Sequence, residues 1–217
     1  MLDIVLSLPR APGTILLLGA HSDDIEIGCG GSLLRMAAAW PQARFHWITL
    51  SADAQRAAET RAAASRLLAG RMVDITVKDF RGSYFPYEGA AIKDYFEMLK
   101  PLAPDLIFTH CRHDLHQDHR VVHELTWNTF RDHLILEYEI PKFDGDLGTP
   151  NVFVTLSREQ LRQKIEILLD CFPSQRSRQW FTRETFEALA RLRGIECNAP
   201  EGFAEAFFAR KLRLAIP

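Results

Sequence analysis

Histidine and acidic residues gather in two short segments of the 217-residue chain. The first segment, residues 19–31, contains His21, Asp23 and Asp24 among glycines and other small residues. The second segment, residues 109–120, contains four of the chain's eight histidines, at positions 110, 113, 116 and 119. Imidazole nitrogens and carboxylate oxygens are the usual ligands of a catalytic zinc ion or a similar divalent ion. The two segments therefore predict a metal site, provided that the fold brings them together.

Short apolar runs alternate with helix-like segments, which predicts an α/β fold: a Rossmann-like three-layer sandwich with a mostly parallel central sheet. Strands are expected over residues 14–18, 44–51, 72–77 and 105–110, and helices over residues 30–40, 54–69 and 90–100. In the common 3-2-1-4-5 strand order, strands one and four are neighbours at the switch point where ligands bind. Because the two histidine segments follow these strands, we expect the active site at the C-terminal ends of strands 1 and 4.

The second half of the chain has a less regular pattern of elements. Helices are expected over residues 120–130, 158–171 and 182–193, and strands over residues 134–140, 152–156 and 203–212. The tetrapeptide Ser-Arg-Glu-Gln at residues 157–160 fits a capping box at the start of the second of these helices. No repeat, low-complexity tract or linker is evident, so we expect residues 1–217 to form a single domain.

The composition excludes several classes of protein. An apolar content of 47% is too high for a disordered chain, and 26 basic against 28 acidic residues give no basic footprint for nucleic acid. No apolar run approaches the roughly 20 residues that a transmembrane helix needs. Residues 1–10 lack the basic lead of a secretory signal, and the four cysteines show no close pairing, so a cytoplasmic location is predicted.

Both segments resemble motifs of the PIG-L family, also called LmbE-like or the N-acetylglucosaminyl-phosphatidylinositol de-N-acetylase family. Residues 20–24, Ala-His-Ser-Asp-Asp, are similar to its Ala-His-Pro-Asp-Asp motif, and residues 116–119, His-Gln-Asp-His, to its His-Pro-Asp-His motif. Each motif has lost its proline here. Proline stiffens a loop but binds no metal, so the replacements bear on loop rigidity rather than on metal binding. Weaker likenesses occur at residues 25–31, 56–59, 172–175 and 204–207.

The resemblance implies a zinc-dependent N-deacetylase with one Zn²⁺ per chain, held by His21, Asp24 and His119; another divalent ion is left open. It also implies that Asp23 is the general base and that His116 helps to stabilise the oxyanion. Two ligating histidines and one carboxylate would leave a coordination position open, as a catalytic zinc requires. A protonated His116 would add a positive charge where negative charge develops.

Other residues near the two motifs are expected to orient groups of the site or to bind substrate. Asp118, two residues from His116, is predicted to orient that ring and to act with it in catalysis. Arg56 and His113 are predicted to bind substrate, although Arg56 could instead pair with Glu59 on its own helix and His113 could simply pack. A cluster formed by Arg176, Arg178 and Arg183 suggests a site for a phosphate carried by the substrate, with a solvated surface as the simpler interpretation.

The expected function is hydrolysis of the N-acetyl group of an amino sugar or its conjugate, which releases acetate and a free amine. The partner is then a small-molecule N-acetylated sugar or glycoconjugate; whether copies assemble into a homo-oligomer is left open. Two alternatives are a zinc amidase for a non-sugar acylated amine and a non-catalytic protein of the same fold that binds metal or sugar. A nucleotide-dependent oxidoreductase is disfavoured, because Leu33 occupies the last glycine position of the G-x-G-x-x-G fingerprint.

Overall fold

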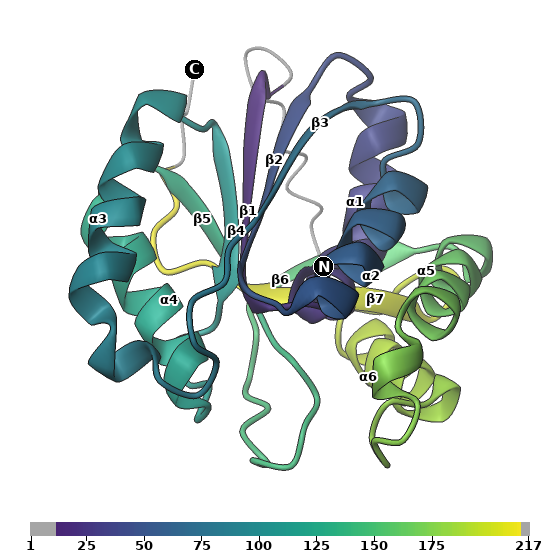
Figure 1. Ribbon diagram of the computed structural model, residues 1–217. Coiled ribbons are helices and arrows are strands. Elements are labelled where there is room, and N and C mark those ends of the chain that lie inside the picture. Colours follow the sequence, from purple (N-terminus) through teal and green to yellow (C-terminus); the bar gives the residue numbers. More distant parts are fainter. Residues whose placement is uncertain (1–11, 214–217) are drawn as a thin grey trace.

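A seven-stranded sheet lies at the centre of the computed structural model, which describes residues 12–213 (Figure 1). The strands are β1 (Thr14–His21), β2 (Arg44–Ser51), β3 (Met72–Val77), β4 (Leu106–His110), β5 (Leu134–Tyr138), β6 (Val152–Leu156) and β7 (Phe203–Phe208). They follow the order β3-β2-β1-β4-β5-β7-β6. The first five strands pair in parallel, whereas β7 is antiparallel to both β5 and β6. The predicted fold class and the neighbourhood of β1 and β4 are confirmed.

Helices cover both faces of this sheet (Figure 1). They are α1 (Asp24–Ala39), α2 (Ala54–Leu67), α3 (Gly89–Leu99), α4 (Gln117–Thr129), α5 (Arg158–Cys171) and α6 (Arg183–Glu196). One face is covered by the helices α1, α2, α5 and α6, and the other face is covered by α3 and α4. The predicted capping box at residues 157–160 is present at the start of α5. Within residues 12–213, no helix combines the length and apolarity required to span a bilayer. Residues 1–10, which carry the prediction about secretion, lie outside the described range.

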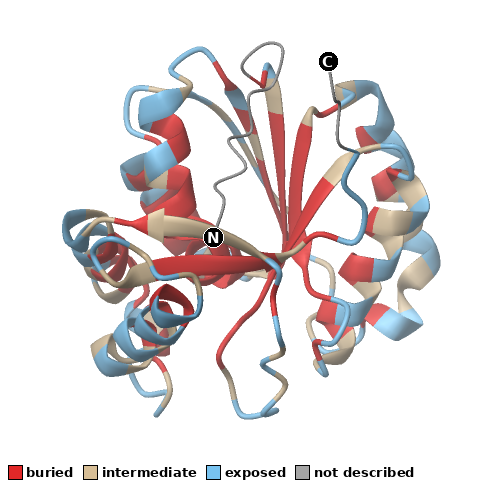
Figure 2. Cartoon of the chain, turned by 180° about the vertical axis from the view of Figure 1, so that it is seen from behind, coloured by how far each residue is buried: buried red, intermediate tan, exposed pale blue. Residues whose placement is uncertain are grey.

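The central strands β1 and β4 are buried on both faces of the sheet, as is typical of parallel strands (Figure 2). Along β1 the side chains alternate between two cores. Ile15 and Leu17 pack with α1, α2 and α5, whereas Leu16 and Leu18 pack with α3 and α4. All four side chains are fully buried. The four cysteines are free thiols, as their spacing predicts.

Helix α1 begins at Asp24, six residues before the predicted start, and therefore includes part of the first histidine segment. The glycines in this segment suggested a loop, but Gly28 serves close packing instead. A Cβ atom at Gly28 would lie 2.3 Å from a ring carbon of Tyr138 on β5. Glycine thus lets α1 pack closely against the sheet at this point, and the acidic residues lie at the N-terminus of the same helix. Helix α4 likewise begins at Gln117, three residues earlier than predicted.

A buried ion pair from the C-terminal half of the chain holds α1 in place. Glu205 on β7 accepts hydrogen bonds from the backbone amides of Gly31 (2.8 Å) and Ser32 (2.6 Å). Lys164 on α5 donates to the carbonyl oxygen of Ile27 (2.6 Å) and to Glu205 Oε1 (2.6 Å). Both charged groups thus have polar partners, which their burial makes necessary. The helix that starts at the acidic segment is fixed by residues that lie 137 to 174 positions away in the sequence.

We predict that Glu205→Ala lowers the free energy of unfolding by about 3–5 kcal/mol, because the substitution leaves the Lys164 ammonium buried without its carboxylate. Urea denaturation followed by circular dichroism measures this change. The matched control is Glu187→Ala, which removes an exposed ion pair with Arg183. If both substitutions had the same small effect, the ion pair could not be important in holding α1.

Candidate active site

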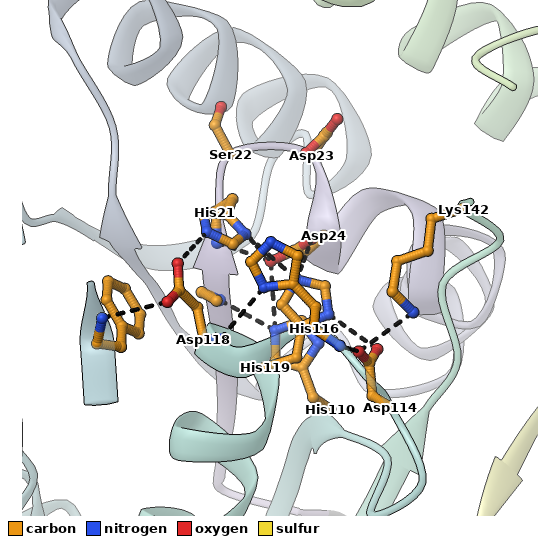
Figure 3. Close-up of polar contacts among 12 residues, drawn as sticks. His21, Ser22, Asp23, Asp24, His110, Asp114, His116, Asp118, His119 and Lys142 are labelled. Atoms are coloured by element: carbon orange, nitrogen blue, oxygen red, sulfur yellow. Dashed lines mark hydrogen bonds and ion pairs between the residues drawn. The ribbon is translucent and has the colours of Figure 1, made fainter. Parts of the chain in front are cut away.

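The two histidine segments meet at the C-terminal ends of β1 and β4 (Figure 3). His21 Nδ1 lies 3.2 Å from His119 Nε2 and 3.6 Å from Asp24 Oδ2. His119 Nε2 lies 3.5 Å from Asp24 Oδ1. The structure therefore brings together three side chains that the resemblance assigns to metal binding.

The spacing of these three donors fits a small divalent cation. Nitrogen and oxygen ligands at about 2.0–2.1 Å from a tetrahedral zinc ion lie about 3.3 Å from one another. The two imidazole nitrogens lie 3.2 Å apart, and each lies 3.5–3.6 Å from a different carboxylate oxygen of Asp24, which is close to that value. The donor types, two imidazole nitrogens and a carboxylate, also match catalytic zinc sites. His21, Asp24 and His119 could thus hold a metal ion with little rearrangement.

A buried carboxylate contacts the outward ring nitrogen of each of these two histidines. His21 Nε2 lies 2.9 Å from Asp118 Oδ2, and His119 Nδ1 lies 2.8 Å from Asp114 Oδ2. Such contacts fix the tautomer and the orientation of a ligating imidazole. They leave His21 Nδ1 and His119 Nε2 as the nitrogens that face the centre.

The predicted pairing of the Asp118 side chain with the His116 ring is wrong. The carboxylate of Asp118 binds His21 and accepts hydrogen bonds from the backbone amides of Ser83 (2.5 Å) and Phe85 (3.2 Å). Its location at the start of α4 directs it across the site towards β1 rather than back along its own helix. The Asp118 side chain therefore binds the first histidine segment, and only its backbone amide contacts the His116 ring.

The protonation of the three residues follows from their surroundings. Burial lowers the pKa of His119 to about 4, so its imidazole is neutral, as a metal ligand must be. Burial alone would also lower the pKa of His21, but its hydrogen bonds to Asp118 and Asp24 raise it to about 10. The nearby histidines hold the pKa of Asp24 well below its ordinary value, against the effect of burial. A metal ion that binds here must displace the proton of His21.

Asp23 occupies an unusual backbone conformation immediately before α1. Its φ of 92° and ψ of −20° are left-handed, a conformation that costs energy for any residue with a side chain. Its side chain makes no capping hydrogen bond to the helix. Oδ1 instead lies 2.9 Å from Arg56 Nη2. Burial raises the pKa of Asp23 to about 7, against the opposing charge of Arg56.

Side chains from α2 replace the rigidity that the missing proline would give to the first motif. Ser22 Oγ donates to the carbonyl oxygen of Arg56 (2.8 Å) and lies 2.5 Å from Thr60 Oγ1. Arg56 in turn donates to the carbonyl oxygen of Ser22. The alternative pairing of Arg56 with Glu59 is wrong, because Glu59 accepts hydrogen bonds from Ser174.

His116 lies at the N-cap of α4 with its ring stacked on that of His119, at a centroid distance of 4.6 Å. Its Nδ1 accepts a hydrogen bond from the backbone amide of Asp118 (3.2 Å). Burial lowers the pKa of His116, and the charge of His21 adds to this effect. A contact with a backbone N–H requires Nδ1 to be an acceptor, which fits a neutral ring with its proton on Nε2.

Two further residues of the site were not predicted from the sequence. His110 stacks on His119 with a centroid distance of 3.9 Å, and its Nε2 lies 3.2 Å from Asp24 Oδ2. Its place in the histidine cluster was a signal, although its position within a strand favoured packing. Lys142, in the loop after β5, lies 3.1 Å from Asp114 Oδ1 and 2.5 Å from Asp146 Oδ2 (Figure 3). A single lysine in a loop gives no signal in the sequence.

Lys142, Asp114 and His119 form a chain of contacts that ends at the candidate metal site. The Lys142 ammonium compensates the charge of the buried Asp114 carboxylate and lowers its pKa together with the histidines, against the effect of burial. Asp114 also accepts from the backbone amide of His116 (2.9 Å). The loop after β5 is therefore tied to the loop that presents His119.

Other residues that the sequence singled out lie apart from this cluster. His113 is exposed, and its ring lies against Phe208, at a centroid distance of 6.2 Å. In the arginine cluster, Arg176 donates to the carbonyl oxygen of Leu169 and Arg183 pairs with Glu187. Arg176 and Arg183 therefore bind neighbouring protein groups, a carbonyl oxygen and a carboxylate, near their own positions in the chain.

We predict that Lys142→Met weakens zinc binding about 10- to 100-fold, the usual effect of losing a partner that supports a metal ligand. Competition titration with a chromogenic chelator measures the affinity. Lys93→Met is the control, because Lys93 lies on α3, where it pairs with Glu97. Equal zinc affinity in Lys142→Met and in the unchanged protein would show that Asp114 positions His119 without help from Lys142.

Comparisons with known proteins agree with the observed fold. The model of the GlcNAc-PI de-N-acetylase family, PIG-L, matches residues 16–130, more than half of the chain. N,N'-diacetylchitobiose deacetylase from Pyrococcus horikoshii is similar in structure, with a TM-score of 0.74 and 19% identity over 95% of this chain and 87% of that one. The conserved protein TT1542 from Thermus thermophilus has a TM-score of 0.72 and 19% identity over 95% and 98% of the two chains.

A third similar structure has a different type of activity in its name. GalB, the 4-carboxy-2-hydroxymuconate hydratase from Pseudomonas putida KT2440, has a TM-score of 0.74 and 16% identity over 94% of this chain and 98% of that one. A search of curated proteins found no match. At such identities, likeness of structure establishes the fold, whereas the family match rests on the sequence segment that carries both motifs. The chain belongs to the PIG-L family.

Proposed function

We propose that this protein is a metal-dependent N-deacetylase that removes the acetyl group from an N-acetylated amino sugar or its conjugate. The observation that carries the proposal is the convergence of His21, Asp24 and His119 at 3.2–3.6 Å, next in the chain to Asp23, a buried carboxylate that binds Arg56. Membership of the PIG-L family supports the same conclusion. Zinc is the proposed metal, on the chemistry of the three donors.

When bound by these residues, zinc supplies Lewis-acid polarisation of an amide carbonyl and lowers the pKa of a coordinated water towards neutrality. The protein must then accept a proton from the attacking water. Asp23 is proposed for this step, because a general base works best with a pKa near the working pH and burial raises the pKa of Asp23 to about 7. Since Oδ1 accepts from Arg56, Oδ2 is the atom proposed to take the proton.

Negative charge develops on the carbonyl oxygen as water adds to the amide. The proton on Nε2 of His116 is proposed to donate a hydrogen bond to this oxygen, while Nδ1 stays bound to the helix amide. A preformed donor of this kind commonly contributes a few kcal/mol to lowering the barrier. The C–N bond then breaks, Asp23 returns its proton to the leaving nitrogen, and the products are acetate and the free amine.

The proposed substrate class rests on the family match and on the structural similarity to the chitobiose deacetylase. Asp118 is proposed to support the reaction by holding His21. Arg56 is proposed to position Asp23 and to face the substrate from α2. His113, exposed on the loop that also carries His116, is proposed to contact the distal part of the substrate.

Hydration of an unsaturated carboxylic acid is the second candidate function. The observation that favours it is the similarity to GalB, whose TM-score equals that of the chitobiose deacetylase. A general base beside a Lewis acid serves either reaction. A substrate screen decides between them: purified protein with added zinc is offered N-acetylglucosamine, its disaccharide and its nucleotide conjugates, and in parallel 4-carboxy-2-hydroxymuconate. Acetate release from a sugar supports the deacetylase, whereas turnover of the muconate alone contradicts it.

We predict that Asp23→Asn lowers the rate constant for acetate release by about 10²- to 10⁴-fold, because the amide cannot accept the proton of water. Zinc content should remain that of the unchanged protein, since Asp23 is outside the three donors. An enzyme-coupled acetate assay and elemental analysis measure the two quantities. Asp94→Asn, on the exposed side of α3, is the control. Full activity in Asp23→Asn would remove this residue from the role of base.

We also predict that a chelator abolishes acetate release and that stoichiometric zinc restores it. His119→Ala should bind zinc much more weakly, because one of three protein ligands is lost. Acetate release is measured at increasing zinc concentration. Activity that survived both chelation and His119→Ala would exclude a metal-dependent mechanism.

A further inference from the structure

A second polar cavity lies along α4, with a lining that includes none of the candidate metal ligands. Its volume is about 520 Å³, and its walls include Arg112, Arg120, Arg131 and Arg210 together with His123 and Trp127. The residues come from three parts of the chain: the loop after β4, the helix α4 with its end, and the segment that follows β7. The space is widely open to solvent, and its four arginines are exposed.

One wall of this cavity is held rigidly. The guanidinium of Arg210 lies 4.1 Å from the centre of a Trp127 ring, and its Nη2 lies 2.9 Å from His123 Nε2. His123 Nδ1 donates to the carbonyl oxygen of His110 (3.0 Å), so Nε2 is an acceptor for Arg210. Trp127 Nε1 donates to the buried Glu137 (2.6 Å). These contacts preorganise Arg210, a condition that reduces the entropic cost of binding a ligand.

The other three arginines have no anionic partner in the described part of the chain. Arg162 and Arg193, in contrast, each pair with two glutamates. Within residues 12–213, no carboxylate lies within 4.0 Å of the guanidinium of Arg112, Arg120 or Arg131.

The excess charge of the cavity is positive. Glu124 is the acidic residue in its lining, and Glu137, which is not part of the lining, lies 3.5 Å from Arg210. Four arginines thus face two carboxylates. The guanidinium group presents its N–H donors in a planar fork that fits phosphate oxygens two at a time. The cavity offers several such forks around one space.

We infer that this cavity is a binding site for a small molecule that carries a phosphate group. The inference concerns a site with its own lining and does not depend on the proposed deacetylase chemistry. The sequence pattern pointed to Arg176, Arg178 and Arg183 for a phosphate, but the structure gathers a different set of arginines around a cavity.

Isothermal titration calorimetry with inorganic phosphate and pyrophosphate, at constant ionic strength, tests the inference. The protein should bind pyrophosphate with a dissociation constant in the roughly millimolar range or below. The double variant Arg112→Gln and Arg120→Gln should weaken binding at least about tenfold. These two side chains are exposed, and the metal ligands stay intact, so any phosphate held by the metal centre is the same in both proteins.

The double variant Arg176→Gln and Arg178→Gln is the matched control and should bind pyrophosphate like the unchanged protein. Thermal unfolding verifies that each variant is folded. The inference is overturned if the unchanged protein binds neither anion at about 10 mM, a concentration at which even a dissociation constant of about 1 mM gives near-saturation. It is also overturned if the control double variant, and not the first, loses binding.

Discussion

The site depends on a constraint between two imidazoles: His21 Nδ1 and His119 Nε2 lie 3.2 Å apart and both face Asp24. Two rings of this kind point to one centre only when their other nitrogens are held. Buried carboxylates, Asp118 for His21 and Asp114 for His119, supply that hold. Their own charges are in turn compensated by backbone amides and by Lys142. Loss of Lys142 or of the backbone amides would free the carboxylates, and loss of a carboxylate would free the imidazole ring that it holds.

The fold positions these site residues by bringing helix N-termini to the ends of neighbouring parallel strands. Asp24 begins α1 directly after β1, and His116 caps α4 after β4. The C-terminal half contributes from outside, since Glu205 and Lys164 fix the first turns of α1. The position of the first histidine segment therefore depends on contacts with α5 and β7, which carry neither of the two motifs. The arginine-lined cavity on α4 shows the same principle, because Arg210 reaches it from beyond β7.

The parts of the structure that local pattern determines could be predicted from the sequence. Continuous apolar runs and turn residues located β1 to β4, and the switch-point rule located the site. The proposed ligands His21, Asp24 and His119 followed from a resemblance. Partner choice could not be predicted, because a carboxylate such as Asp118 has several rings within reach and only packing selects among them. Lys142, and the four arginines of the second cavity, are assembled by tertiary contacts between segments with no shared local signal.

The proposed chemistry requires that His21, Asp24 and His119 together hold a metal ion. Crystals of the protein grown with zinc, measured on both sides of the zinc absorption edge, test this requirement most directly. We predict one strong anomalous difference peak per chain, about 2.0–2.2 Å from His21 Nδ1, His119 Nε2 and a carboxylate oxygen of Asp24. No peak between these three side chains, or a peak held by other residues, would contradict the proposed metal site.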